Sequence, residues 1–388
     1  MEETEELLIQ KYLRGNGENA SFQFFRDELH LMIKEAEDGC RVLFKYNQIE
    51  SPLGNPICQE ARGLILDRGC DWDVVSWPFR KFFNHGEGHA APIDLSTAVI
   101  LEKVDGTCIT MYFWQNKWRT QTLGMIDAEG CVNNIFLPAT FNELFHRTLG
   151  VDITLGLNPY YTYTFELATP YNRIVTRYEK ERIVLLSIRD VLTLKEVPFG
   201  SNIFNSLYLE LNVKVLLNAK VIIDLPEIYP VAVTSLKEVA TMASQLPQMS
   251  EGYVVVDNNF NRVKVKNPSY LALLHLKDSS TSSVKALVEL ILKNEGSEFL
   301  AYFPEFKSQY DRLSELITKI KDKLKEVWEN TKEIKNQKEF ALAVLATGVP
   351  FNNILFALRN GRTPSVEEGM RELDAKRVVE VLKLEDGQ

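Results

Sequence analysis

The stretch Leu101–Thr110, LEKVDGTCIT, places a lysine, an aspartate and a glycine between two apolar runs of the kind that form β-strands. Lys103 is therefore either a solvated charge at a turn or a reactive amine held between two strands. The tetrapeptide Lys-x-Asp-Gly does not decide the matter alone, because the same composition favours an ordinary turn. The rest of the chain has to supply the groups that a reactive lysine needs.

The chain has 388 residues, enough for two domains and a substantial core. Its five cysteines are widely spaced and form no Cys-x-x-Cys pair, so we expect free thiols in a reducing compartment. The opening residues MEETEELLIQ are acidic, unlike a secretory leader, and no apolar run is long enough to cross a bilayer. These features predict a cytoplasmic protein without membrane association, in the host cytoplasm if its source is a virus.

The net charge of −9 argues against a protein that coats nucleic acid nonspecifically. It remains compatible with an enzyme that acts on nucleic acid, because such an enzyme needs a local cationic groove rather than a basic average.

The pattern along the chain changes once. Phe22–Ala36 has the periodicity of an amphipathic helix. From Arg41 to about Lys266, short β-branched and aromatic runs alternate with Gly, Pro, Asn and Asp, and one helical stretch, Ser235–Gln245, interrupts them. This part predicts an α+β domain with mostly antiparallel strands.

Beyond Pro268 helical periodicity takes over, in Ser283–Lys293, Gln309–Thr331, Lys338–Leu345 and Val366–Leu384. The low-complexity bridge Lys277–Ser283 lies near the change, so we divide the chain into domains 1–275 and 276–388, the second all-helical. For the long second helix we expect an apolar side made of Leu313, Leu316, Ile317, Ile320 and Leu324. Its lysine-rich side is then either a solvated face or a surface that touches folded RNA.

A lysine becomes a nucleophile when burial or nearby cations lower its pKa. Attack on a phosphate also needs cations that stabilise charge on the phosphoryl oxygens. The run VKVK, Val263–Lys266, would supply two of them, because in a strand Lys264 and Lys266 share one face while the valines point into the core. Alone, this run is more typical of a half-exposed strand.

Carboxylates stand at the ends of two other predicted strands. In EGYVVVD, Glu251 precedes an apolar strand in which Val254 could contact a base, and Glu251 itself could hold a magnesium ion. In TFELATPYNRIV, Glu166 lies two positions from Thr164, so both side chains share one strand face. Each fragment is weak by itself, and only the ordered set is informative.

The ordered set resembles the covalent nucleotidyltransferases, which include polynucleotide ligases and messenger-RNA capping enzymes. EARGLILD at Glu60–Asp67 and WPFRKFFNHGE at Trp77–Glu87 narrow the likeness to the phage-type RNA ligase 1 family, with its ARG and KFFN motifs before the lysine. The likeness spans roughly residues 40–275 and includes RIVLLSIR at Arg182–Arg189. It implies an adenylyltransferase domain of nucleotidyltransferase (ATP-grasp-like) fold in residues 1–275.

The resemblance also implies roles for individual cations. Lys103 would carry AMP through a phosphoramidate bond. Arg62 and Lys81 would contact the ATP phosphates, while Lys264 and Lys266 would hold the α-phosphate and the oxygens beside it.

The remaining implied roles belong to carboxylates, glycines and the pocket wall. Asp105, Glu166 and Glu251 would share ribose contact, catalysis and binding of Mg²⁺ or Mn²⁺, with Glu166 and Glu251 as the metal ligands. Gly106 and Gly252 would allow close backbone approach. The pocket would be shaped by two apolar side chains, Phe83 and Val254.

One position departs from the family pattern. The family usually has a basic residue directly before a Gly-Ser pair after the second strand, whereas here Leu123 precedes Gly124 and Met125 follows it. Arg119 is a candidate for the missing cation.

The set as a whole predicts an ATP-dependent RNA ligase that joins 5′-phosphate and 3′-hydroxyl ends through lysyl-AMP and RNA-adenylate. Its expected job is repair or circularisation of broken RNA, with tRNA as one candidate substrate, and its expected state is monomeric. Two alternatives stay open: a DNA ligase or capping enzyme, and a noncatalytic RNA-binding protein of the same fold.

Overall fold

The structure is a computed structural model that describes residues 6–17, 22–132, 139–150, 157–218, 223–230, 232–271, 283–302 and 306–383. Two compact units divide the chain. The first comprises residues 1–47 and 51–270, and the second comprises residues 48–50 and 271–388. Among the described residues, no helix is long and apolar enough to span a membrane. All five cysteines are free thiols, as predicted.

The first sheet of the first unit holds the strands that precede the lysine. Its order is β1-β2-β3-β4, all antiparallel, with bounds β1 Leu31–Glu35, β2 Arg41–Tyr46, β3 Arg62–Asp67 and β4 Asp73–Ser76. Three short helices accompany it: α1 Leu8–Asn16, α2 Gln23–Asp27 and α3 Pro56–Glu60. Helix α3 begins at the cap Asn55, whose side chain accepts a hydrogen bond from the Ile57 N–H, and it delivers the chain to Arg62 at the start of β3.

The predicted helix over Phe22–Ala36 is wrong beyond its first turns. Helix α2 ends at Asp27, and Leu31–Glu35 forms β1 instead. The reason is tertiary: β1 pairs along its whole length with β2, from Leu31 opposite Tyr46 to Glu35 opposite Val42. Gly39, at φ +75°, makes the turn between them, and this pairing overrides the helical periodicity.

The second sheet follows the lysine. Its order is β11-β10-β9-β7-β8, with bounds β7 Thr107–Trp114, β8 Lys117–Thr122, β9 Tyr161–Ala168, β10 Arg182–Asp190 and β11 Ile223–Asp224. Helices α4 (Phe141–Leu149) and α5 (Asn202–Asn218) contribute Phe145 and Phe204 to a core with Tyr163 and Phe165 of β9. Since strand side chains alternate, Thr164 and Glu166 lie on the opposite face, as predicted.

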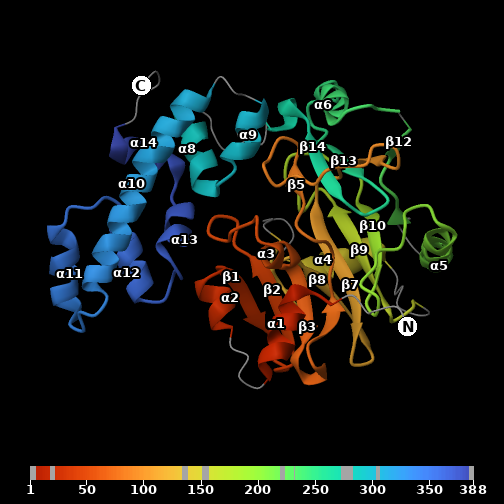
Figure 1. Ribbon diagram of the computed structural model, residues 1–388, viewed down its shortest axis with the longest axis horizontal. Coiled ribbons are helices and arrows are strands. Elements are labelled where there is room, and N and C mark those ends of the chain that lie inside the picture. The colour runs from red at the N-terminus through yellow and green to blue at the C-terminus, as the bar shows by residue number, and fades with distance from the viewer. Residues whose placement is uncertain are drawn as a thin grey trace. The chain divides into compact units, whose positions relative to one another are not determined.

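The third sheet carries the lysine pair. Its order is β12-β6-β13-β14-β5, with bounds β5 Phe83–Asn84, β6 Val99–Glu102, β12 Ile228–Tyr229, β13 Gly252–Val256 and β14 Arg262–Lys266. Helix α6 (Leu236–Ser244), capped by Ser235, packs Val239 against Val263 and Val265. The valines of VKVK are thus in the core and the lysines on the other face, as predicted. Most pairs are antiparallel; β10–β11 and β14–β5 are parallel. Figure 1 shows the three sheets.

The second unit is helical, as predicted, with bounds α8 Ser283–Lys293, α9 Gly296–Tyr302, α10 Lys307–Thr331, α11 Gln337–Ala346, α12 Asn353–Arg359, α13 Val366–Arg371 and α14 Ala375–Leu382. The expected helix Val366–Leu384 is two helices, because Asp374 caps a new one by accepting a hydrogen bond from the Arg377 N–H. The low-complexity bridge lies outside the described residues, except for Ser283.

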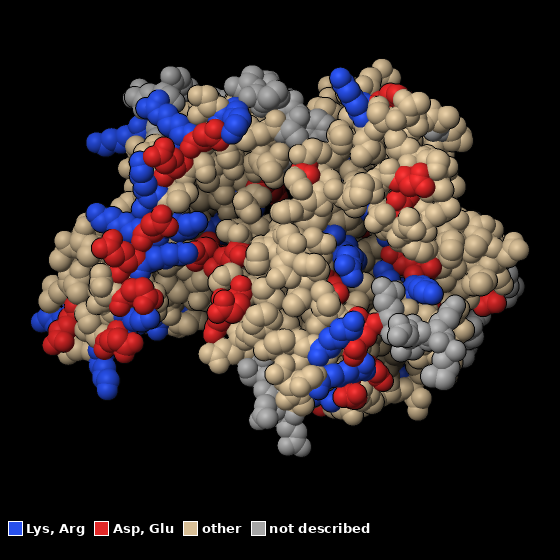
Figure 2. Space-filling model, in the orientation of Figure 1, with Lys and Arg blue, Asp and Glu red and all other residues tan. Residues whose placement is uncertain are grey.

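Helix α10 faces its own unit with Leu313, Ile317 and Leu324 buried and Ile320 partly buried, whereas Leu316, predicted to be inside, is exposed. Three of its lysines are paired with acids: Lys307 bonds Asp311, Lys319 bonds Glu315 and Lys325 bonds Glu367. Figure 2 shows Lys/Arg and Asp/Glu interspersed over the helices of this unit on the face in view. Mixed charge of this kind favours a solvated face over a surface dedicated to RNA backbone.

Candidate active site

Lys103 lies in the short link between β6 of the third sheet and β7 of the second. Its backbone N–H donates to the Gly252 carbonyl oxygen at 2.9 Å. Its Nζ lies 2.8 Å from Oε2 of Glu251, and Nζ of Lys266 lies 3.8 Å from Oε1 of the same carboxylate. Residues 103, 251 and 266 are distant in sequence, and the structure brings them to one carboxylate.

Two glycines make this approach possible. A Cβ on Gly252 would stand 2.7 Å from the Lys266 Cα and closer still to the Val265 carbonyl oxygen, and the φ of Gly252 is +136°. A Cβ on Gly106 would stand 3.0 Å from the Leu167 carbonyl carbon. Only a residue without a side chain fits at either position.

Lys264 is half-buried and lies among the other cations of the group. Burial lowers its pKa well below the ordinary value, and the positive charges of Lys81, Lys266, Lys103 and Arg62 lower it further. Its Nζ lies 5.1 Å from the ring centre of Phe82. Five basic side chains therefore surround one small region, and such a cluster is stabilised by an anion.

Glu166 is half-buried on the same side. Burial raises its pKa to about 8, with Lys103 opposing the shift and the charges of Glu251 and Asp105 adding to it. Cys108, directly across the β7–β9 ladder, is equally enclosed, and burial raises the pKa of its thiol to about 12. Glu166 thus binds its proton tightly in the free protein, and a bound cation would favour loss of that proton.

Asp105 has a different environment from the one expected for a ligand-binding carboxylate. It is buried, and its Oδ2 accepts hydrogen bonds from the N–H groups of Val175 and Thr176 at 3.0 and 2.7 Å. Its own N–H donates to the Tyr178 hydroxyl at 3.1 Å. In this structure Asp105 fixes the segment after β9 against the lysine link.

The raised pKa of Glu166 gives a pH prediction. The folded protein holds a proton at pH values where the unfolded chain, with a carboxyl pKa near 4.5, has released it. This stabilising contribution is complete below the unfolded pKa and is lost as the pH rises through about 8. We therefore expect thermal unfolding of the metal-free protein to shift downward between about pH 5 and pH 8, with Glu166→Gln flattening that slope. The exposed Glu129, changed to Gln, is the control; an unchanged slope in Glu166→Gln would contradict the assignment.

Arg62 and Lys81 frame the neighbouring region. The Arg62 guanidinium lies 5.1 Å from the Phe82 ring centre, and its Nη1 is buried without a hydrogen-bond partner in the described part of the chain. Lys81 Nζ lies 4.8 Å from the Tyr46 ring centre and 5.3 Å from that of Phe83. An unpaired buried donor costs free energy, so Arg62 has the character of a group that awaits an anionic ligand.

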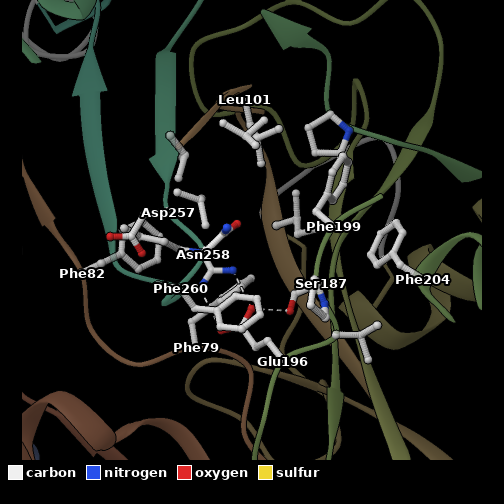
Figure 3. A pocket seen from close by; sticks show the side chains of 18 of the residues that line it. Phe79, Phe82, Leu101, Ser187, Glu196, Phe199, Phe204, Asp257, Asn258 and Phe260 are labelled. Carbon is white, nitrogen blue, oxygen red and sulfur yellow. Dashed lines mark hydrogen bonds and ion pairs between the residues drawn. The ribbon is translucent and has the colours of Figure 1, made fainter. Parts of the chain in front are cut away.

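A cavity of about 310 Å³ opens beside the lysine link, large enough for a base and sugar. Its walls include Leu101 and Glu102 of β6, Leu186 of β10 and Val254 of β13. Figure 3 shows Leu101 and Phe199 on one side of the cavity and Phe82 and Phe260 on another. Val254 is where the sequence placed it, in the wall of a pocket.

A second cavity, of about 690 Å³, is lined by Phe82 as well. Its other walls carry Trp77 and Phe83 together with the basic residues Arg80, Lys81 and Lys195. Aromatic faces among cations are what single-stranded nucleic acid binds.

Sequence reasoning missed one buried network in the wall between the cavities. Glu196 bonds Arg262 at 2.5 Å and Arg189 at 2.8 Å, and it accepts from Ser187 at 2.8 Å. Burial acts to raise the Glu196 pKa, but the two arginines lower it overall. Arg189 lies near the end of β10 and Arg262 begins β14, and nothing in the sequence pairs these two strand residues with Glu196.

Arg119 does not supply the missing cation. It donates to Asp127 at 3.3 Å and lies 5.2 Å from the Trp114 ring centre. Its cross-strand partner on β7 is Tyr112. Tyr112 lies four residues, about 13 Å along the strand, from Cys108, which is the cross-strand partner of Glu166, so Arg119 is too far from the site.

No group of three or more His, Cys, Asp or Glu residues is arranged as a metal site among the described residues. Glu166 and Glu251 are nevertheless close enough for their charges to interact. Mg²⁺ is typically held by one or two carboxylates with phosphates and water completing its shell. The donor set therefore fits a divalent ion that arrives with a polyphosphate, and not one held by protein alone.

Antiparallel sheets that bring a lysine, further cations and carboxylates together, with a mostly apolar cavity walled by the residues just before that lysine, are typical of a nucleotidyltransferase. The chain belongs to the phage-type RNA ligase 1 family: the RNA ligase family matches residues 60–270. The predicted family, fold class and enzyme class, RNA ligase, are thereby confirmed.

Two relatives show the extent of the similarity. An RNA ligase of Rhodothermus phage RM378 is 29% identical over 71% of this chain and 73% of its own length. A chain of Autographa californica nuclear polyhedrosis virus, named as a bifunctional polynucleotide kinase/RNA ligase, is 30% identical over 73% of this chain but only 40% of its own length. Among solved structures, an archaeal ATP-dependent RNA ligase is 14% identical, with 84% of this chain and 85% of that chain covered and a TM-score of 0.45.

Proposed function

We propose that this RNA ligase works by three nucleotidyl transfers with Lys103 as the nucleophile and ATP as the AMP donor. The observation that carries the proposal is the position of the Lys103 amine, which is bonded to Glu251 and shares that carboxylate with Lys266. The base-sized cavity is walled by Leu101 and Glu102, the two residues directly before Lys103 in the chain. The residues 1–275 would form the adenylyltransferase domain and 276–388 a helical domain.

In the first step, Nζ of Lys103 gives up a proton and attacks the α-phosphorus. A P–N bond forms, the bond from the α-phosphorus to the bridging oxygen breaks, and pyrophosphate leaves. Glu251 holds the amine at 2.8 Å, close enough to receive its proton. Lys264 and Lys266 stabilise the charge that develops on the α-phosphoryl oxygens.

In the second step AMP passes from Lys103 to the 5′-phosphate of RNA. In the third step a 3′-hydroxyl attacks that phosphate and AMP leaves. A divalent ion held through Glu166 and Glu251 would compensate phosphate charge in these transfers. The base pocket walled by Leu186 and Val254 would hold the adenosine throughout, so the same cavity serves all three steps.

The natural substrate we propose is RNA broken to leave 5′-phosphate and 3′-hydroxyl ends, with tRNA as the candidate. The second cavity, with Arg80 and Lys195 near Trp77, supports binding of a single-stranded end.

The test uses ATP and GTP that carry a label in the α-phosphate. We expect ATP alone to label the protein, through a bond that is stable to alkali and cleaved by acid, as a phosphoramidate is. The labelled protein should then join 5′-phosphate to 3′-hydroxyl RNA without added ATP. Labelling by GTP would indicate a capping enzyme, joining of DNA ends in preference to RNA would indicate a DNA ligase, and RNA binding without labelling would indicate a noncatalytic protein.

A further inference from the structure

The end of β8 lies against the strand that carries Arg62. Gln121 Nε2 donates to the Gly63 carbonyl oxygen at 2.7 Å. A Cβ on Gly63 would stand 3.1 Å from the Leu123 Cα. Position 123 is therefore adjacent to the strand residue that follows Arg62, but its own side chain is apolar.

A lysine from another strand reaches this place. The Lys45 Nζ lies 3.2 Å from where a Cβ of Gly124 would stand, so its ammonium group lies beside the backbone of the residue after Leu123. Lys45 is the cross-strand partner of Arg62 in the β2–β3 ladder, which sets both side chains at the same level of the sheet. Lys34 donates to the Gly124 carbonyl oxygen at 2.8 Å and fixes the turn against this sheet.

The charges around Tyr46 show that Lys45 lies near Lys81 and Arg62. Burial acts to raise the pKa of this phenol, yet Lys81, Arg62 and Lys45 lower it overall. The Lys81 Nζ lies 4.8 Å from the centre of the Tyr46 ring. Three cations from three segments, Lys45, Lys81 and Arg62, thus converge on one side, and Lys81 and Arg62 act in turn on Lys264.

We propose that Lys45 binds the pyrophosphate portion of ATP and stabilises it as it leaves Lys103-bound AMP, supplying from β2 the cation that position 123 lacks. This inference rests on the proposed function and deepens it. Lys264 and Lys266 lie at the lysine that receives AMP, so a triphosphate bound there extends its remaining two phosphates toward the next cations, Arg62, Lys81 and Lys45. Negative charge builds on the leaving pyrophosphate as the bond from the α-phosphorus breaks, and a cation placed there lowers the barrier.

The geometry restricts this role to one step. Pyrophosphate leaves only when Lys103 is adenylylated, whereas the two later transfers move AMP. Lys45 is therefore dispensable for sealing RNA that already carries a 5′-adenylate, and it is needed for the reverse reaction of Lys103-AMP with pyrophosphate.

The experiment compares Lys45→Ala with wild type in single-turnover adenylylation by α-labelled ATP. We expect a fall of about 10- to 100-fold in the rate of Lys103-AMP formation, a matching fall in pyrophosphate-driven loss of AMP, and unchanged sealing of pre-adenylylated RNA. The double variant Lys45→Ala with Leu123→Lys should regain much of the lost rate, because an ammonium group returns to the same place from the residue that follows β8. Lys117→Ala, at the exposed turn of the β7–β8 hairpin, is the matched control and should behave as wild type.

The outcomes separate the two proposals. If wild type forms no Lys103-AMP, the proposed function fails and the role of Lys45 falls with it. If wild type is labelled and Lys45→Ala is labelled at the same rate, only the role of Lys45 is overturned. An equal loss in sealing of pre-adenylylated RNA would assign Lys45 to general folding of the site and would also overturn it.

Discussion

Lys103→Ala will take up no label from ATP and will join no RNA that bears an ordinary 5′-phosphate. Removal of the attacking amine leaves the first two steps without the atom on which AMP is carried, so we expect a loss on the order of 10⁴-fold or more. Glu251 keeps Lys266 as a charged neighbour at 3.8 Å, so the carboxylate is not left isolated. Rapid-quench labelling and gel assays of RNA joining measure the effect.

The same variant should retain sealing of pre-adenylylated RNA, because the third step uses no lysine nucleophile. Lys103→Arg is the companion change: it keeps a positive charge beside Glu251 but is no nucleophile, since a guanidinium is not deprotonated in proteins. Formation of a labelled protein by either variant would refute Lys103 as the site of AMP attachment.

Gly252→Ala will damage stability and the first step together. At φ +136° an L-residue is strained, and the new Cβ would collide with the Val265 carbonyl group and stand 2.7 Å from the Lys266 Cα. We expect a loss of about 3–5 kcal/mol in the free energy of unfolding. Relief of the collision would separate β13 from β14, which moves Glu251 away from Lys266 and breaks the bond from the Lys103 N–H to the Gly252 oxygen.

Gly39→Ala is the matched control for the backbone conformation. Gly39 has φ +75° but nothing within 4 Å of its Cβ position, so it should lose about 1 kcal/mol and keep full adenylylation. Denaturant unfolding and single-turnover labelling are the two measurements. A Gly252→Ala protein as stable and active as Gly39→Ala would show that close approach at position 252 is not required.

The sequence predicted those parts of the fold in which local pattern and tertiary packing agree. Strict alternation in VKVK placed Val263 and Val265 in the core and the lysines opposite, and the predicted helical stretch Ser235–Gln245 contains α6. The run Leu31–Glu35 was misread because its helical spacing is real but its pairing with β2 is stronger. Helix α5, Asn202–Asn218, was missed because its apolar residues do not gather on one face.

The candidate site was predictable in its parts and not in its contacts. The resemblance of the ordered motifs to a known family indicated Lys103, Glu251 and Lys266, but not that one carboxylate would bind both amines. Lys45 carried no signal, because its place beside Gly124 depends on how two different sheets meet. The Glu196 network was hidden for the same reason: its arginines and its glutamate are joined only by the folded chain.

Lys103 occupies the covalent link between two sheets, with β6 ending at Glu102 and β7 beginning at Thr107. Any movement of the two sheets relative to each other must therefore move the Lys103 amine relative to Glu166 on the second sheet and to Lys264 on the third. An adenylate bound to Lys103 would contact both sheets and restrict this movement. The adenylylated and the free enzyme should then differ in flexibility. We expect amide hydrogen exchange along β6, β7 and β13 to be slower when Lys103 carries AMP.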